Sequence, residues 1–168
     1  MKYEIREMNV DDIYAVIEGE EEVFGKSLGF DFFYQDLKLN PFAYYFVLDI
    51  NGSVEGYFGI YISDYMGDII NFYVRKKYQK LGFGGLLLDF IIELCEMSNC
   101  KSISLEVRKS NTKAICLYEK RGFVVSRIRK SYYDDGEDAV VYIKYFEVKD
   151  DSFRGWNKLW WNSCKYSC

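Results

Sequence analysis

A glycine-rich block at residues 78–85, with the sequence YQKLGFGG, constrains the possible folds of this chain more than any other segment. It follows an apolar run at residues 69–74, which predicts a strand, and precedes an apolar run at residues 86–95 with helical spacing. Glycines at such a junction leave the N–H groups of the helix N-terminus uncovered, and the helix dipole adds positive charge. The block therefore predicts a phosphate or pyrophosphate site, with a tight packing turn as the alternative.

Strand and helix signals alternate along the rest of the chain. We expect strands at residues 3–8, 43–50, 54–63, 69–74, 101–107, 123–133 and 139–146. Helices are expected after Asn9 or Asp11, after the glycine block and from Asn111 to Gly122, while residues 30–39 form a short helix or an aromatic-rich loop. The order predicts one α/β domain at residues 1–149, with a mixed, mostly antiparallel central sheet of about seven strands flanked by about four helices. Residues 150–168 form a C-terminal extension that contains Trp156, Trp160 and Trp161.

The composition argues against several classes of function. The 168-residue chain has a net charge of -4 and a pI of about 5.0, which argues against general nucleic-acid binding. It contains no histidine, so most His-dependent nucleophilic schemes are removed and no metal site is expected. With no secretory signal and no membrane-spanning run, five scattered cysteines indicate a reduced, cytoplasmic protein. Cys95 and Cys116 are expected to be buried core thiols.

A second block, residues 105–111 with the sequence LEVRKSN, leads into a helix that contains Tyr118. Glu106 falls near the end of a strand and Tyr118 on the next helix, so a carboxylate and a phenol could act as base and acid beside one cleft. Both have simpler interpretations, since a strand glutamate commonly pairs with a surface Arg or Lys and Tyr118 continues an apolar helix face. Asn111 is well suited to cap that helix.

The two blocks together resemble the GNAT acyltransferase superfamily. The spacing Gln79-x-x-Gly82-x-Gly84 is similar to its acetyl-coenzyme A (acetyl-CoA) signature, and residues 105–123 resemble the protein N-terminal acetyltransferases. Within these, the chain resembles the bacterial enzymes that acetylate the N-terminal alanine of ribosomal protein S18, including at residues 129–139. The resemblance covers residues 3–146. At residues 24–28 the chain has FGKSL where those enzymes carry a Pro-Trp-Ser-like element that helps shape the peptide site.

The resemblance implies an N-acetyltransferase that uses acetyl-CoA as co-substrate and acts by direct transfer, with Glu106 as general base and Tyr118 as general acid. It places Glu106, Tyr132 and Tyr133 beside the acceptor peptide. It places the cofactor against one strand, the glycine block and the next helix, at Phe72, Tyr73, Val74, Gln79, Lys80, Leu81, Gly82, Phe83, Gly84, Gly85, Asn111 and Tyr118.

Two other functions stay open: a GNAT enzyme for a small amine or a lysine side chain, and a catalytically silent acetyl-CoA-binding module. Residues 132–139 favour a peptide acceptor, with ribosomal protein S18 as the leading partner. Glu20, Glu21 and Glu22 either attract a basic peptide or form a solvated helix face. We expect a monomer or homodimer with no nucleic acid partner and no membrane span.

Overall fold

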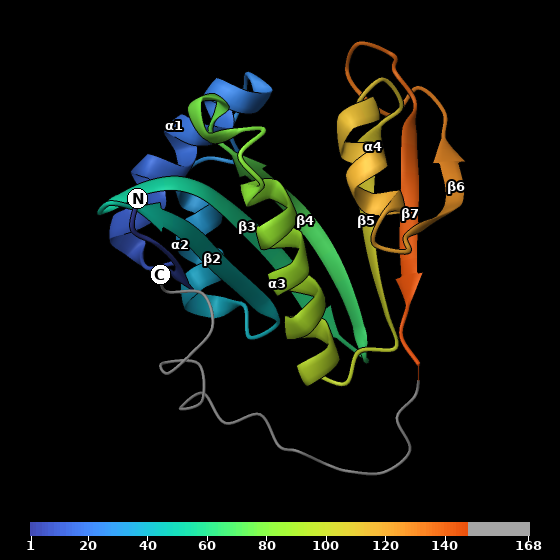
Figure 1. Cartoon of the computed structure of the whole chain (residues 1–168), viewed down its shortest axis with the longest axis horizontal. Helices are drawn as coiled ribbons and strands as arrows, with labels where there is room; N and C mark the ends of the chain where they lie inside the picture. Colours follow the sequence, from blue (N-terminus) through green and yellow to red (C-terminus); the bar gives the residue numbers. More distant parts are fainter. Residues whose placement is uncertain (148–168) are drawn as a thin grey trace.

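The computed structural model describes residues 1–147. Within them, seven strands form one sheet with the order β1-β2-β3-β4-β5-β7-β6, in which only β4 and β5 pair in parallel (Figure 1). The strands are β1 Tyr3–Glu7, β2 Ala43–Ile50, β3 Ser53–Ser63, β4 Met66–Val74, β5 Ser102–Arg108, β6 Val124–Arg129 and β7 Ala139–Tyr145. The helices are α1 Ile13–Phe24, α2 Phe30–Leu39, α3 Phe83–Met97 and α4 Thr112–Glu119. The predicted fold class is confirmed.

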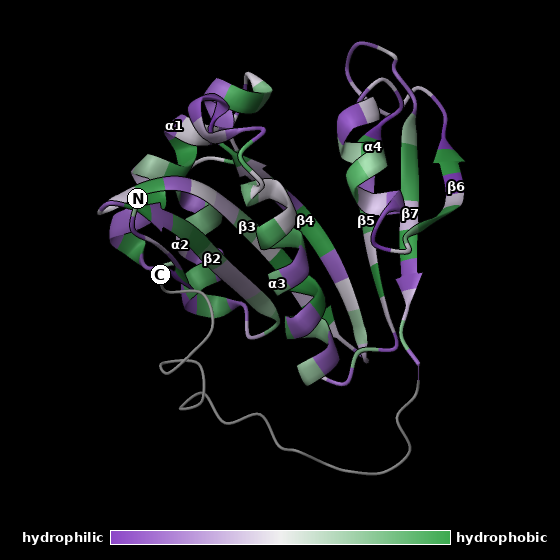
Figure 2. Ribbon diagram, viewed as in Figure 1, coloured by the Kyte–Doolittle hydropathy of each residue, from purple (hydrophilic) through white to green (hydrophobic). Residues whose placement is uncertain are grey.

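Helices cover both faces of the sheet, α1 and α2 on one side and α3 and α4 on the other (Figure 1). Side chains of β2 alternate between the two cores: Tyr45 and Val47 pack with α1 and α2, whereas Phe46 and Leu48 pack with α3. A strand buried on both faces needs apolar residues at every position, which explains the long apolar run of β2. In Figure 2, apolar residues line β4 and β7, whereas the loop between β6 and β7 is hydrophilic.

The sheet splits between β4 and β5. Their parallel pairing covers only Met66–Asp68 against Ser102–Ser104, and the two strands separate beyond it (Figure 1). A register shift in the β3–β4 pairing, between Gly59 and Ile60, lies just beyond the same point. Such a bulge bends a strand away from its neighbour. The facing edges of β4 and β5 therefore diverge toward the glycine block, which follows β4.

Three details differ from the expectations. Strand β6 ends at Arg129, because residues 130–138 form a loop in which Ser131 has a positive φ of 49° and its N–H donates to Asp138. Cys95 is buried as predicted, but the prediction for Cys116 is wrong, since it is exposed on α4. The domain end at residue 149 and the tryptophan-rich extension lie outside the described residues. Among residues 1–147, no helix is both long enough and apolar enough to cross a membrane.

Asp36 joins α2 to the sheet and makes stability depend on pH. It accepts hydrogen bonds from the hydroxyls of Tyr45 (2.6 Å) and Tyr61 (2.5 Å) and from Asn40 (3.0 Å). Burial by itself would raise the pKa of Asp36, but these hydrogen bonds hold it below its ordinary value. A carboxyl whose pKa is lower in the folded state stabilises the fold above its unfolded pKa, and this stability is lost as the pH falls through the folded value.

We expect Asp36→Asn to lower the free energy of unfolding at pH 7 by about 1–2 kcal/mol. The reason is that two tyrosine hydroxyls lose a charged acceptor. The difference should begin to shrink below about pH 4, where the carboxyl of the unfolded chain becomes protonated, and should shrink further as the pH falls through the lower folded pKa of Asp36. Urea unfolding at pH 7 and pH 3 measures it, with Asp31→Asn on the exposed side of α2 as control. If Asp36→Asn lowered the free energy of unfolding equally at both pH values, the prediction would be contradicted.

Candidate active site

The glycine block forms an open helix N-terminus at the mouth of the split sheet. Gly82 is the N-cap of α3 with a φ of +93°, and no side chain caps the helix. The first helical hydrogen bond runs from Leu86 N–H to Gly82 C=O (3.0 Å), so the N–H groups of Phe83, Gly84 and Gly85 have no partner within the helix. The 15-residue helix behind them adds its dipole. This arrangement fits the pyrophosphate of a coenzyme.

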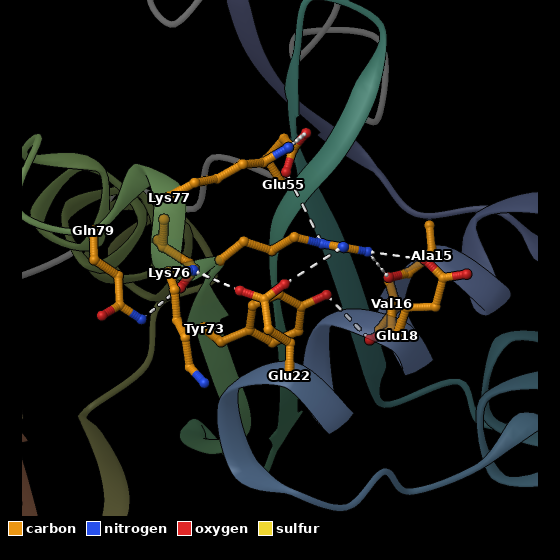
Figure 3. A network of polar contacts seen from close by, with 11 residues as sticks. Ala15, Val16, Glu18, Glu22, Glu55, Tyr73, Lys76, Lys77 and Gln79 are labelled. Carbon is orange, nitrogen blue, oxygen red and sulfur yellow. Dashed lines mark hydrogen bonds and ion pairs between the residues drawn. The ribbon is translucent and has the colours of Figure 1, made fainter.

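Polar contacts anchor the segment between β4 and the glycine block to α1 and β3 (Figure 3). The N–H of Lys76 donates to Glu22 (2.9 Å), and Lys77 Nζ donates to Glu55 (2.7 Å). The Tyr73 hydroxyl donates to the carbonyl of Val16 in α1 (3.1 Å). These bonds tie the strand end to its neighbours, so the open amides are held in place before any ligand binds.

Arg75 is the centre of this anchoring network. The backbone N–H of Arg75 donates to the Glu55 carbonyl (2.8 Å). Nη2 of its side chain donates to the Ala15 carbonyl (3.0 Å) and to the Glu18 carboxylate (3.3 Å). Its guanidinium also pairs with Glu22 at 3.6 Å. Sequence reasoning did not single out Arg75, because a basic residue beside a glycine turn has no signal that separates bracing from ligand binding.

Two residues predicted to contact the cofactor form side-chain hydrogen bonds with the protein backbone. Gln79 Nε2 donates to the Val74 carbonyl (2.9 Å) and so braces the turn after β4 (Figure 3). The Asn111 side chain accepts from the N–H of Ala114 (3.2 Å) and caps α4, as its position in the sequence predicts. Both lie at the split, but the bonds they make here support the local backbone.

Gly82 offers a direct test of the cofactor site. A β-branched residue at positive φ costs about 1–2 kcal/mol, so Gly82→Val should displace the amides and weaken coenzyme A binding about tenfold or more. Titration calorimetry with coenzyme A measures this. Gly52→Val is the matched control, since Gly52 also has a positive φ (+84°) but lies in the β2–β3 turn. Both variants should lose stability, and an equal loss of affinity in the two would refute the assignment.

Glu106 lies in β5 two residues beyond Ser104, the last residue paired with β4, and so at the split. Its Oε1 is 2.8 Å from Arg129 Nε, although the N–H does not point at the oxygen, so this contact is an ion pair without a hydrogen bond. Tyr132 interacts with the same carboxylate. Its interaction with Glu106, followed by burial, raises the pKa of Tyr132. The Glu106 side chain is 28% exposed and remains accessible.

The loop between β6 and β7 is fixed against β5. Arg108 pairs with Asp135 and Glu137, each at 2.8 Å, and its guanidinium lies 3.9 Å from the ring centre of Tyr133. Glu137 also accepts from the N–H of Ser110 (2.8 Å). The structure thus brings the predicted pair Tyr132 and Tyr133 to the side of Glu106, on a loop and not on a strand.

Tyr118 in α4 lies across the split from β4. Its ring is 6.1 Å from that of Phe72 in β4 and 6.2 Å from that of Tyr142 in β7. Burial, followed by the charge of Tyr133, raises the pKa of Tyr118, so its hydroxyl keeps its proton. Within residues 1–147 no hydrogen-bond partner of this hydroxyl is found. The structure therefore agrees with the apolar packing expected from the sequence and leaves the hydroxyl free to donate.

Arg129 was missed by the sequence reasoning. It pairs with Glu106, and its guanidinium lies 5.2 Å from the ring centre of Tyr132. Arg129 begins the segment 129–139 that shares the family resemblance, but a basic residue on an edge strand usually faces water, so nothing in the sequence pairs it with Glu106. Only the pairing of β6 with β7, and of β7 with β5, brings it to the carboxylate.

A split α/β sheet with an open helix N-terminus, and with a carboxylate and a phenol at the split, fits an acyltransferase that uses a coenzyme A thioester. Residues 10–123 match the family described as Acetyltransferase (GNAT) family. The chain belongs to this family, and it is an acetyl-CoA-dependent N-acetyltransferase.

The chain aligns with relatives of named activity over nearly their whole length. A Bacillus subtilis (strain 168) protein provisionally named ribosomal protein bS18-alanine N-acetyltransferase is 38% identical over 141 residues, 83% of this chain and 93% of that protein. An N-alpha-acetyltransferase of Sulfurisphaera tokodaii is 31% identical over 151 residues, 82% and 90% of the two chains. The crystal structure of the ribosomal-protein-S18-alanine N-acetyltransferase from Escherichia coli superposes with a TM-score of 0.80 at 26% identity, covering 92% and 99%. The resemblance predicted from the sequence is confirmed.

Proposed function

We propose that the protein acetylates the N-terminal α-amine of another protein, with the N-terminal alanine of ribosomal protein S18 as its substrate. The observation that carries the proposal is the position of Glu106, which lies at the split with a 28% exposed carboxylate, next to Arg129 and the Tyr132 ring on which Arg129 lies. The named activities of the relatives from Bacillus subtilis and Escherichia coli support alanine as the acceptor residue.

The chemistry needs one base and one acid. An α-amine has a pKa of roughly 7.7–8.0 and is mostly protonated at neutral pH. Glu106, directly or through one water, takes a proton from this amine, so that the nitrogen lone pair can form the new C–N bond. The Tyr118 hydroxyl donates a proton to the sulfur as the C–S bond breaks, and the second proton that the nitrogen loses passes through solvent and restores this hydroxyl. Direct transfer of this kind needs no histidine, and the chain has none.

Acetyl-CoA supplies the acetyl group, activated as a thioester. The residues that would hold it are the open amides of residues 82–85 and the edge of β4 at residues 72–74, which has no partner from β5. Gln79 and Asn111 keep the turn after β4 and the start of α4 in shape. Amides at the β4 edge would stabilise charge on the thioester carbonyl oxygen. The predicted cofactor residues belong to the end of β4, to the glycine block and to α4 with its N-cap.

A lysine side chain or a small amine is the alternative acceptor. The loop that carries Tyr132 and Tyr133 favours a peptide, because two aromatic rings beside the base offer an extended surface to several residues. A silent binding module is disfavoured by the accessible carboxylate at the split.

Mass spectrometry of two peptides after incubation with acetyl-CoA tests the proposal. One peptide begins with a free alanine followed by the start of S18 and contains no lysine. The other has the same sequence with a blocked N-terminus and one internal lysine. Acetylation of the first alone supports the proposal. Acetylation of the second alone would assign the protein to the lysine acetyltransferases, and reaction of neither would overturn the S18 assignment.

A further inference from the structure

Glu20 in α1 carries a fully buried carboxylate (0% exposed). Its Oε1 accepts from the Tyr57 hydroxyl (2.7 Å) and Asn71 Nδ2 (2.8 Å), and its Oε2 accepts from Ser27 Oγ (2.7 Å) and the Leu28 N–H (2.9 Å). Among residues 1–147 no cation pairs with it. Burying a carboxylate is costly unless its oxygens are fully hydrogen-bonded, and these four donors meet that need. Both sequence interpretations of the acidic run are therefore wrong for Glu20.

The four donors come from two parts of the molecule. Tyr57 in β3 and Asn71 in β4 belong to the sheet, whereas Ser27 and Leu28 belong to the loop between α1 and α2. Each end of that loop has a glycine at positive φ, and the hydrogen bonds of these two glycines stay within α1, the loop and α2, so none of them ties the loop to the sheet. Glu20 is thus the buried link that holds the α1–α2 loop to the sheet.

The α1–α2 loop lies beside the candidate acceptor site. Lys26 Nζ is 3.2 Å from Asp134, which is two residues after Tyr132 on the loop that lies against Glu106. This ion pair is exposed, with side chains 70% and 94% accessible, and such pairs hold a loop only weakly. The position of the loop therefore depends on the buried bonds to Glu20.

The same carboxylate also acts on the strand beside the split. Asn71 lies in β4 three residues beyond Asp68, where pairing with β5 ends. Its side chain bonds Glu20 on one face, while the next residue, Phe72, contacts Tyr118 on the other face. One buried carboxylate thereby connects the α1–α2 loop to the strand segment that borders the reacting groups.

We infer that Glu20 is a positioning residue for the acceptor peptide: it holds the α1–α2 loop and β4 in one arrangement, and this arrangement sets the affinity for the acceptor. The inference rests on the proposed function. It assigns Glu20 no contact with the reacting atoms.

Glu20→Gln tests this with little change of shape. Asn71 Nδ2 and the Leu28 N–H can only donate, so in either orientation the new amide nitrogen faces a donor and at least one bond is lost. We expect the KM for the alanine peptide to rise about tenfold, while kcat and coenzyme A affinity stay within about threefold. Glu21→Gln, one position on and exposed, is the matched control and should leave all three unchanged.

Two further variants separate positioning from stability and serve even if Glu20→Gln does not fold. Ser27→Ala removes a loop-side bond to the buried carboxylate and should raise the acceptor KM about threefold, with a loss of stability similar to that of Tyr57→Phe. Tyr57→Phe removes a sheet-side bond and should lower stability while the acceptor KM stays within about twofold. If Glu20 served stability alone, the KM would stay constant in both variants or would change more in Tyr57→Phe.

Hydrogen exchange at the Leu28 amide makes the test independent of the acceptor. Exchange should be at least about tenfold faster in Glu20→Gln than in the wild type. Equal exchange, or an unchanged acceptor KM in both Glu20→Gln and Ser27→Ala, overturns the inference. If the wild type acetylates no N-terminal peptide, the proposed function fails, and the Leu28 comparison still decides whether Glu20 holds the loop.

Discussion

Glu106→Gln should lower kcat for the alanine peptide by about 10²–10³-fold at pH 7 and leave coenzyme A affinity nearly unchanged. Glutamine keeps the shape of the side chain and can still accept from Tyr132, but it cannot take a proton. The deficit should narrow toward pH 9, because the free amine then dominates and needs no base. Steady-state rates between pH 6.5 and 9 measure both effects.

A neighbouring carboxylate provides the control for Glu106. Glu119, the last residue of α4, accepts a hydrogen bond from Tyr142 (2.9 Å) and is not a candidate base, so Glu119→Gln should keep kcat within about threefold. A Glu106→Gln enzyme with wild-type turnover at pH 7 would refute the base assignment. A deficit that is constant with pH would point to lost peptide binding instead of lost proton transfer.

Tyr118→Phe should lower kcat by about 10²-fold with little effect on folding. The ring keeps its contacts with Phe72, Phe123 and Tyr142, and only the hydroxyl is removed. Since burial raises the pKa of Tyr118, the loss should persist across neutral and mildly alkaline pH. We expect the melting temperature to change by less than about 4 °C.

Tyr142→Phe is the matched control for this experiment. Tyr142 lies in the same aromatic cluster, but its hydroxyl donates to Glu119. The Tyr142→Phe variant should lose some stability and keep kcat within about threefold of the wild type. If Tyr118→Phe turned over at the wild-type rate, Tyr118 would be a packing residue only, as its place on the apolar helix face also allows.

The sequence predicted the order of elements because each had a strong local signal. Residues 30–39 were predicted as a helix or a loop, and the helix is confirmed with the same bounds. The hairpin of β6 and β7 was placed correctly, but its loop was predicted too short. Local turn bonds of Ser131 and Asp138 end β6 early, and such bonds compete with strand pairing without changing the hydrophobic pattern.

By itself, the sequence determined the fold class and the open turn at residues 78–85, because strand, helix and glycine signals are local in the chain. The candidate pair Glu106 and Tyr118 came from the family resemblance of residues 105–123. Only the tertiary structure decided which long-range partners these residues have. Two strand pairings bring Arg129 into an ion pair with Glu106. The packing of distant segments buries Glu20 among hydrogen-bond donors from the α1–α2 loop, β3 and β4. A charged side chain looks the same in a sequence whether it meets water or a buried partner, and only the packing of distant segments separates the two.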